Sequence, residues 1–356
     1  MLTRVSDAMI PSRPQPEPRA ASTADSPAGA FLQPLPGLVW ACRLGANGTA
    51  DELPIDRPVG EHQTGWLWLH FNLADARACQ LLRSLTDFPA EAKELLLTAD
   101  EHQQLHVKET CIYGIFADLV CGLHGVTEEI GFLHFAMNET LLVTARRPML
   151  NAAEATRQAL RKDRKVTTVA GLLECILEQV IEALEHYAEH LAGELDQSEE
   201  RILADDMCGD RQVLGRVRRT TVRQHRQLAI LRSLIHRFEQ DIGQHANPAF
   251  RLTTDRLLQR LDWLDNEVVG LRDRSHLLQE EVMLKTAEQT NRNLQLLALV
   301  TTIFLPANLV AAIFGMNVKG LPLTDNSSGF LWSLVLLVGV SAAVFWLLKR
   351  SGILGR

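Results

Sequence analysis

The sequence lacks the residue patterns that mark the common enzyme and metal-binding classes. Its six cysteines are scattered and none stands in a Cys-x-x-Cys pair, which indicates neither a disulfide framework nor a zinc ribbon and favours reduced cytosolic thiols. No Gly-x-Gly-x-x-Gly, P-loop or Gly-x-Ser-x-Gly motif occurs. Because no catalytic triad or paired carboxylates can be picked out either, we predict that the protein is not an enzyme and needs no cofactor.

The chain also lacks a strong net charge. The formal value is -7 at pH 7, which argues against nucleic acid as a partner. Charged and apolar residues are unevenly distributed, because almost all the long apolar runs follow Asn293. In residues 1–30 no apolar segment follows the early arginines, so we expect a disordered arm there and not a secretory signal.

Two long apolar runs near the C-terminus are the clearest positive signal. Residues 294–314 form 21 positions without a charge, which as a helix reach ~31 Å, the thickness of a bilayer core. Residues 330–348 give 19 more, and residues 315–329 between the runs are rich in Gly, Pro, Asn and Ser. We predict two transmembrane helices joined by a short loop; the alternative is a pair of buried helices in a soluble domain.

Basic residues near the two spans predict their orientation. The cytoplasmic side of a span carries the excess of lysine and arginine. The loop has only Lys319, offset by Asp325, so we expect the loop outside and both termini in the cytoplasm. The basic residues that flank the spans are Lys285, Arg292, Lys349, Arg350 and Arg356.

The residues before the first span predict one long helix. Between Phe250 and Phe314 the only glycine is Gly270 and the only proline is Pro306, so we expect a stalk over residues 249–314 that continues into the first span. Polar residues at membrane depth usually face protein or water, which favours a pore lining over simple helix packing. One heptad row of this helix is Asn266, Asp273, Glu280, Ala287, Leu294, Thr301 and Asn308, and a companion row is Gly270, Leu277, Leu284, Asn291, Ala298, Leu305 and Ala312. A single hairpin cannot enclose a pore, so several copies must assemble.

The remaining residues predict a cytosolic part of two kinds. Residues 31–150 alternate strand-like runs (37–45, 65–73, 111–122 and 130–148) with helical ones (74–85 and 90–104), which indicates an α/β domain. Residues 151–248 hold an acidic helix followed by a basic one, which favours an antiparallel hairpin with facing charges. The fold class we predict is therefore α+β, with an N-terminal α/β domain, a helical stalk and two C-terminal spans.

Two histidine pairs have the i, i+4 spacing that can hold zinc on a helix. They are His102 with His106 and His186 with His190. Neither pair has further ligands in register, and an ordinary surface pair is the alternative.

The triplet Gly315-Met316-Asn317 directly follows the first span. With the stalk before it and a second span 15 residues later, the chain resembles the CorA-type family of divalent-cation transporters from about Phe31 to its end. The stretch "FLHFAMNETLLVTARRP" is similar to the family's strand pair. Within the family, "FGMNVKGLPL" looks closer to the ZntB zinc-transporter branch than to the magnesium branch, although Lys319 departs from the small residue usual there.

The resemblance implies a funnel-shaped homopentamer in the inner membrane, in which the stalk and first span line the pore. It assigns Gly315, Met316 and Asn317 to an outer selectivity motif. It makes Leu294 and Leu305 hydrophobic constrictions and Glu280 a cytosolic metal-sensing carboxylate, with Asp273 as a second acidic candidate. The pore-facing positions that it implies are Asn291, Leu294, Leu297, Thr301, Leu305 and Asn308.

The residue types in the two spans restrict which kinds of ion they could carry. Between Leu294 and Leu348 the only ionisable residues are Lys319 and Asp325, with no histidine or cysteine, so a dehydrated tetrahedral zinc site is not indicated. Rings of amide and hydroxyl oxygens suit a cation that keeps its water shell. We expect zinc transport first; the alternatives are a magnesium, cobalt or nickel channel and a membrane-tethered scaffold or sensor that does not conduct.

Overall fold

The computed structural model describes residues 35–55, 65–108, 111–122, 125–205, 210–244, 254–316 and 329–350. The expected disordered arm over residues 1–30 lies outside these ranges. The chain divides into two compact units, one of Met1–Glu194 with Val217–Arg272 and one of Leu195–Arg216 with Asp273–Arg356. Each unit is described by itself.

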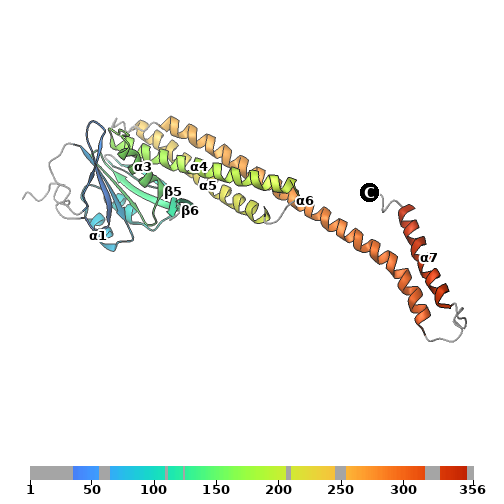
Figure 1. Ribbon diagram of the computed structural model, residues 1–356. Coiled ribbons are helices and arrows are strands. Elements are labelled where there is room, and N and C mark those ends of the chain that lie inside the picture. Colours follow the sequence, from blue (N-terminus) through green and yellow to red (C-terminus); the bar gives the residue numbers. More distant parts are fainter. Residues whose placement is uncertain are drawn as a thin grey trace, which may run out of the picture. The chain divides into compact units, whose positions relative to one another are not determined.

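The first unit contains a seven-stranded mixed sheet in the order β2-β1-β3-β7-β6-β5-β4 (Figure 1). The strands β3 and β7 pair in parallel and the other neighbours are antiparallel. Their bounds are β1 Leu38–Leu44, β2 Ala50–Leu53, β3 Trp66–Asn72, β4 Gln104–Lys108, β5 Cys111–Gly122, β6 Gly125–Met137 and β7 Leu141–Arg146.

The sequence patterns missed the two edge strands. Five strands lie in the predicted apolar runs, but β2 (ADEL) and β4 (QLHVK) are short, polar and partly exposed. Edge strands are commonly short and polar because an apolar edge would pair with other chains, and such strands carry little hydrophobic signal. The predicted helix over residues 90–104 is correspondingly wrong in its second half, since α2 (Ala90–Leu97) ends seven residues earlier.

Helices cover both faces of this sheet. Helix α1 (Ala76–Ser84) and α2 pack on one face, where Leu82, Leu96 and Phe71 belong to one buried cluster. Helix α3 (Asn151–Arg161) packs on the other face. Its first turn is held by the carboxylate of Asp118 in β5, which accepts hydrogen bonds from the backbone N–H of Ala152 at 2.7 Å and of Leu119 at 2.8 Å.

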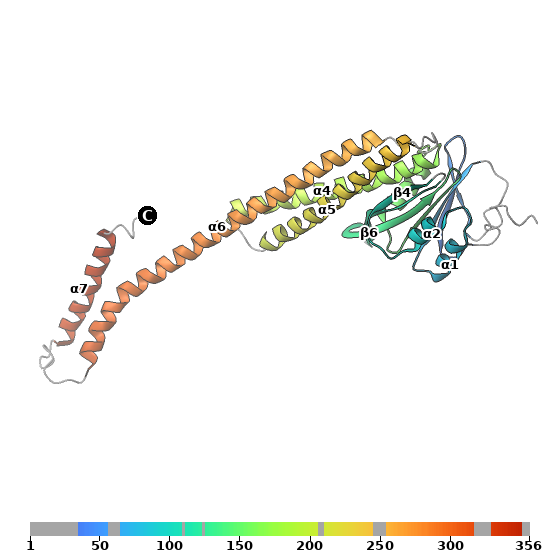
Figure 2. The ribbon, with the colours of Figure 1, turned by 180° about the vertical axis from the view of Figure 1, so that it is seen from behind.

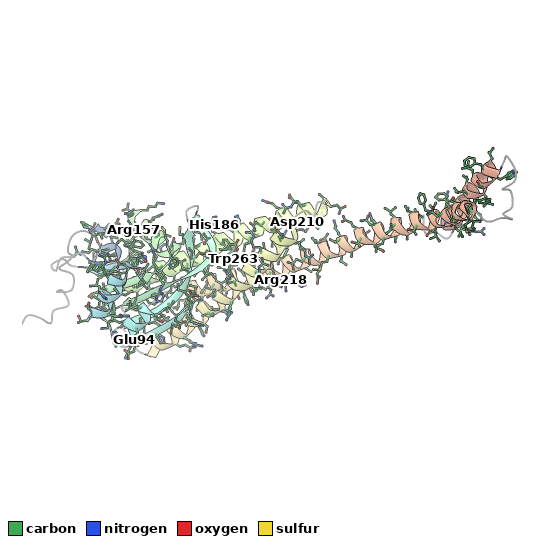
Figure 3. All side chains as sticks on the ribbon, turned by 90° about the horizontal axis from the view of Figure 1, so that it is seen from below. Glu94, Arg157, His186, Asp210, Arg218 and Trp263 are labelled. Atoms are coloured by element: carbon green, nitrogen blue, oxygen red, sulfur yellow. The ribbon has the colours of Figure 1, made fainter. Side chains whose placement is uncertain are left out.

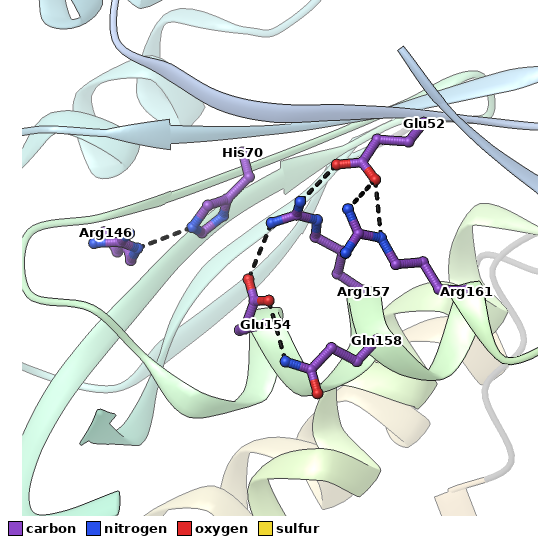
Figure 4. A network of polar contacts seen from close by, with 7 residues as sticks. All are labelled: Glu52, His70, Arg146, Glu154, Arg157, Gln158 and Arg161. Carbon is purple, nitrogen blue, oxygen red and sulfur yellow. Dashed lines mark hydrogen bonds and ion pairs between the residues drawn. The ribbon is translucent and has the colours of Figure 1, made fainter. Parts of the chain in front are cut away.

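Between α3 and the sheet lies a network of polar contacts, in which His70 is buried and Glu52 and Arg161 are exposed (Figure 4). Arg146 Nε donates to His70 Nε2 at 3.1 Å, so His70 carries its proton on Nδ1 and donates it to Thr144 Oγ1 at 2.8 Å. The pKa of His70 lies well below its ordinary value, because burial and the Arg146 charge disfavour the cation. Trp40 stacks on His70 with centroids 3.9 Å apart, and the Arg157 guanidinium lies 4.8 Å from the Trp40 ring centroid. These contacts fasten α3 to the first strands of the sheet.

The four long helices are α4 (Val169–Leu203), α5 (Asp210–Gln244), α6 (Thr254–Gly315) and α7 (Gly329–Arg350). In the first unit, Glu185 of α4 pairs with Arg260 of α6 at 2.6 Å. His225 of α5 contacts Asp265 of α6 at 2.6 Å, and Arg232 of α5 pairs with Asp262 at 2.7 Å. The acidic and basic helices thus each find partners on α6, which carries both signs; their facing-charge contact with each other stays a prediction.

Asp118 gives the first unit a measurable pH dependence. Burial raises its pKa to about 7, which outweighs the backbone hydrogen bonds that lower it. The pKa of Asp118 in the folded chain exceeds its value of ~3.9 in the unfolded chain. The contribution of Asp118 to the free energy of unfolding is therefore full below about pH 4 and is lost as the pH rises through 7. We predict that the free energy of unfolding falls by roughly 2–4 kcal/mol between pH 5 and pH 8, measured by urea unfolding of the full chain in detergent.

In the variant Asp118→Asn this pH slope should flatten, because the amide does not titrate; its single oxygen can replace only one of the two carboxylate acceptors, so the variant also loses one bond at every pH. The exposed Asp51→Asn is the matched control and should keep the wild-type slope. An Asp118→Asn protein with the wild-type pH slope would contradict the assignment.

Candidate functional site: the uncovered face of helix α6

Helix α6 is a single helix of 62 residues, as the composition of its sequence predicts (Figure 2). Its interior contains one proline, Pro306, which has no N–H to donate to the carbonyl of Thr302. The helix ends at Gly315, and the N–H of Met316 donates to the carbonyl of Ile313 at 3.4 Å. The apolar run thus stops at the Gly-Met-Asn triplet, where Asn317 lies outside the described residues.

One side of α6 is buried against its own chain. The buried positions follow one another at alternating steps of four and three, which is the heptad spacing of coiled-coil packing. They are Leu257, Leu261, Leu264, Val268, Leu271, Ser275, Leu278 and Val282. The pattern stops at Val282, and no later residue of α6 is buried within the described part of the chain.

The opposite side of α6 is uncovered along its whole length. It carries both rows that the sequence analysis singled out, and every member of the two rows is exposed. The residues implied to be constrictions, Leu294 and Leu305, are 58% and 68% exposed. At about 100° per residue, the six implied pore positions from Asn291 to Asn308 lie within roughly one third of the helix circumference. The chain therefore leaves open one continuous face that runs from the stalk into the apolar segment.

Two helices are long and apolar enough to cross a membrane. They are α6, whose most apolar window is almost wholly uncovered, and Phe330–Leu347 within α7, whose window is wholly uncovered. Uncovered apolar surface of this extent is unfavourable in water and needs lipid or further protein. The two helices coincide with the predicted spans.

The hydroxyl of Thr301 has a defined role within the open face. It donates to the carbonyl of Leu297, one turn earlier, at 2.8 Å. Since the proton is committed to the helix, the oxygen presents lone pairs to its surroundings. Such an oxygen accepts hydrogen bonds from the water shell of a cation.

Among the described residues of the second unit, the printed ion-pair partner of Glu280 is a histidine on the same helix. The carboxylate of Glu280 lies 3.5 Å from His276 Nδ1, and both side chains are at least half exposed. Arg274, a nearby arginine of α6, contacts Asp196 of α4 at 2.7 Å and also Glu199. Asp273 lies exposed on the same row and has an interaction partner of its own. Glu280 thus keeps its charge facing outward on the open side of α6.

The histidine pairs do not gather into a metal site. His102 precedes β4 and contacts Asp100, while His106 lies in β4 and stacks on Tyr113, so the helix expected to carry them is wrong. His186 and His190 do share helix α4 and lie exposed. His186 (labelled in Figure 3) lies 3.5 Å from Glu189. His190 lies 3.8 Å from Glu194. Within the described ranges, no group of three or more His, Cys, Asp or Glu side chains is placed to hold a metal ion.

Comparison with known proteins identifies the class and then the family. A family model described as "CorA-like Mg2+ transporter protein" matches residues 63–350. The chain belongs to this family of ion transporters, which confirms the resemblance drawn from the Gly-Met-Asn triplet and the expectation that it is not an enzyme.

Curated relatives cover nearly the whole chain at low identity. The "Divalent cation transporter CmaX" of Pseudomonas aeruginosa is 24% identical over 334 residues, 88% of this chain and 96% of that protein. The "Zinc transport protein ZntB" of Enterobacter sp. is 23% identical over 326 residues, 89% of this chain and 96% of that protein.

Solved structures share the fold. The full-length CmaX protein aligns with a TM-score of 0.72 and 22% identity, covering 88% of this chain and 97% of that chain. The CorA magnesium transporter from Methanocaldococcus jannaschii aligns with a TM-score of 0.66 and 19% identity, covering 89% and 99%. The predicted fold class, an α/β domain with a long helix and two C-terminal candidate spans, is confirmed.

Shortening a side chain to alanine should affect stability differently on the two faces of α6. Leu264 is fully buried, so Leu264→Ala should lower the free energy of unfolding by about 2–5 kcal/mol. Asn266→Ala, two residues away on the open face, should change it by less than about 0.5 kcal/mol. Urea unfolding of the full chain in detergent measures both. Equal losses of unfolding free energy in the two variants would show that the buried and open faces are not distinct.

Proposed function

We propose that the protein is a homopentameric transporter that carries divalent cations, zinc foremost, across the inner membrane. The observation that carries the proposal is the open face of α6, which continues without a break from the cytosolic stalk into the membrane-length apolar segment. One copy cannot enclose a path, whereas a ring of copies that turn this face inward can. Membership of a family described as Mg2+ transporters supports a divalent cargo.

The orientation follows from the flanking charges. A hairpin with both ends on the cytoplasmic side is supported by the described basic residues beside the spans, Lys285 and Arg292 before the first and Lys349 and Arg350 after the second. The α/β domain and the three-helix part then lie in the cytoplasm. The Gly-Met-Asn triplet lies at the outer mouth, where Gly315, Met316 and Asn317 would meet incoming ions.

The residues of the open face suit a cation that keeps its water shell. Asn291, Thr301 and Asn308 offer uncharged oxygens, and no ionisable side chain occurs between Leu294 and Met316. Leu294 and Leu305, with Leu297, form apolar rings that close the path by excluding water. Zinc is the preferred cargo because several relatives are named zinc transport proteins. Magnesium is the second candidate, favoured by the description of the family model.

Asn317 should be essential for transport. Asn317→Ala removes the ring of amides at the outer mouth and no apolar packing, so it should lower zinc uptake into proteoliposomes by at least about tenfold, or ~1.4 kcal/mol. Native mass spectrometry should show an unchanged oligomer. The matched loop variant Asn326→Ala should transport as the wild type does, and full uptake by Asn317→Ala would remove the triplet from the pathway.

Glu280 should contribute to cation binding on the cytosolic side. Five copies of its carboxylate around an axis repel one another, and this repulsion favours a bound cation. Glu280→Gln should weaken zinc binding to the full-length oligomer by about tenfold in calorimetry. Glu267→Gln, an exposed change on another side of α6, is the control. If both variants bind zinc equally well, Glu280 is a surface charge only.

A further inference from the structure

A small cavity in the first unit lies between the sheet and the helices α4 and α5. Its volume is about 10 Å³, which is the room that one water molecule needs. Apolar side chains close it, among them Leu184 of α4 and Leu228 of α5. Its polar lining consists of Asp118 of β5, Gln103 just before β4, and Gln224 and Gln227 of α5. The cavity is therefore a polar site within an otherwise apolar contact.

Gln224 is the unsatisfied residue of this lining. Its side chain is 3% exposed, and among the described residues neither Oε1 nor Nε2 has a hydrogen-bond partner. A buried amide without partners costs free energy, so such groups are nearly always bonded to protein or to an ordered water. The neighbouring Gln103 has its partners, because Oε1 accepts from the N–H of Ala117 at 3.2 Å and Nε2 donates to Gln227 Oε1 at 2.8 Å. The amide of Gln224 thus needs a ligand in the cavity.

Asp118 can bind the same ligand. Its side chain is 2% exposed, and each carboxylate oxygen accepts one backbone N–H, from Leu119 and from Ala152. Further lone pairs, or a proton, remain for a ligand. Because burial raises the pKa of Asp118 to about 7, this carboxyl group exchanges its proton near neutral pH.

Asp118 is the titratable group among the described residues that line the cavity. Helix α3 contributes backbone N–H groups of Asn151 and Ala152 toward it. The charged residues next to the lining on the packed elements are exposed or bonded elsewhere: Glu129, Arg223 and Arg226 are exposed, and His102, Glu154, Glu185 and His225 contact Asp100, Arg157, Arg260 and Asp265. Protonation of Asp118 therefore determines the charge of the cavity.

We propose that Asp118 and Gln224 hold one water molecule and one exchangeable proton in this cavity, and that loss of the proton loosens α5 on the sheet. The site is separate from the open face of α6, and the proposal does not depend on ion transport. It gives the α/β domain a sensor of pH.

One water molecule can bond to Gln224 in both protonation states. When Asp118 is protonated, its O–H donates to the water, and the water donates to Gln224 Oε1. When the proton has left to the solvent, the water donates to the carboxylate and Gln224 Nε2 donates to the water. The charged state remains the costlier one, because a buried carboxylate without a counter-ion is poorly solvated by a single water. Helix α5 is therefore held more firmly at pH 6 than at pH 8.

The loosened part of α5 is also the part that contacts α6. His225, the residue after Gln224, lies 2.6 Å from Asp265 of α6. A change in how α5 lies on the sheet thus occurs directly beside this contact.

Infrared spectroscopy of the full chain in detergent tests the site. The C=O stretch of a protonated carboxyl group is recorded against pH, and subtraction of the Asp118→Asn spectrum isolates Asp118. We expect the wild-type band to disappear around pH 7. In Gln224→Met, which keeps the length of the side chain without its amide, it should disappear about one pH unit higher, because the carboxylate loses a charge-assisted chain of hydrogen bonds.

Gln224→Leu is a second apolar variant, and the exposed Gln240→Met of the same helix is the matched control, which should titrate as the wild type does. An unchanged or lowered titration in both Gln224 variants would remove Gln224 from the site. If wild type and Asp118→Asn have the same carboxyl band at pH 6, Asp118 holds no proton there and the proposal is wrong.

Hydrogen exchange of the α5 amides tests the loosening. After correction for the intrinsic effect of pH on exchange, opening of residues 224–231 should be about tenfold more frequent at pH 8 than at pH 6 in the wild type. It should be independent of pH in Asp118→Asn. Equal opening of the wild type at the two pH values would show that the proton does not hold α5.

Discussion

Helix α6 is covered by its own chain along one side only, and the rest of the structure depends on this constraint. Heptad-spaced residues from Leu257 to Val282 fix one side against the other helices, and ion pairs such as Arg260–Glu185 and Arg274–Asp196 hold the register. The opposite side is left without cover over the same length. In the proposed ring of copies this uncovered side faces the axis, and the remaining chemistry lies around it.

The bilayer imposes a second requirement on helix α6. Beyond Val282 no described residue of α6 is buried, and the helix becomes apolar over a length that spans hydrocarbon. Polar groups in such a segment need partners, and Thr301 satisfies its proton within the helix while keeping its oxygen available. In the proposed function, transport depends on oxygen ligands and apolar rings, and the charge lies in the cytosolic stalk at Glu280. This division suits a hydrated ion better than a tightly bound one.

The sequence predicted the features that depend on local patterns. Local patterns predicted the two apolar runs, the long helix and the rows of α6 that lie exposed. The heptad spacing of the buried side of α6 is also present in the sequence, but it was not among the predictions. The polar edge strands β2 and β4 were not predicted, because edge strands bury little. The partners of Arg260 and Arg274 could not be derived either, since they join residues 75 or more positions apart. The same holds for the Asp118 cap on α3 and the cavity beside α5, which exist only once the chain is folded.

The most direct test of the account is whether water reaches the open face of α6 inside the membrane. Single cysteines placed from Asn291 to Asn308 can be treated with a charged, membrane-impermeant thiol reagent in oriented vesicles, with and without zinc. The account predicts labelling at Leu294, Thr301, Leu305 and Asn308, slowed by zinc, and none at Val300, Ile303 and Ala307 on the other side of the helix. Labelling confined to the second set, or absent from both, would contradict it.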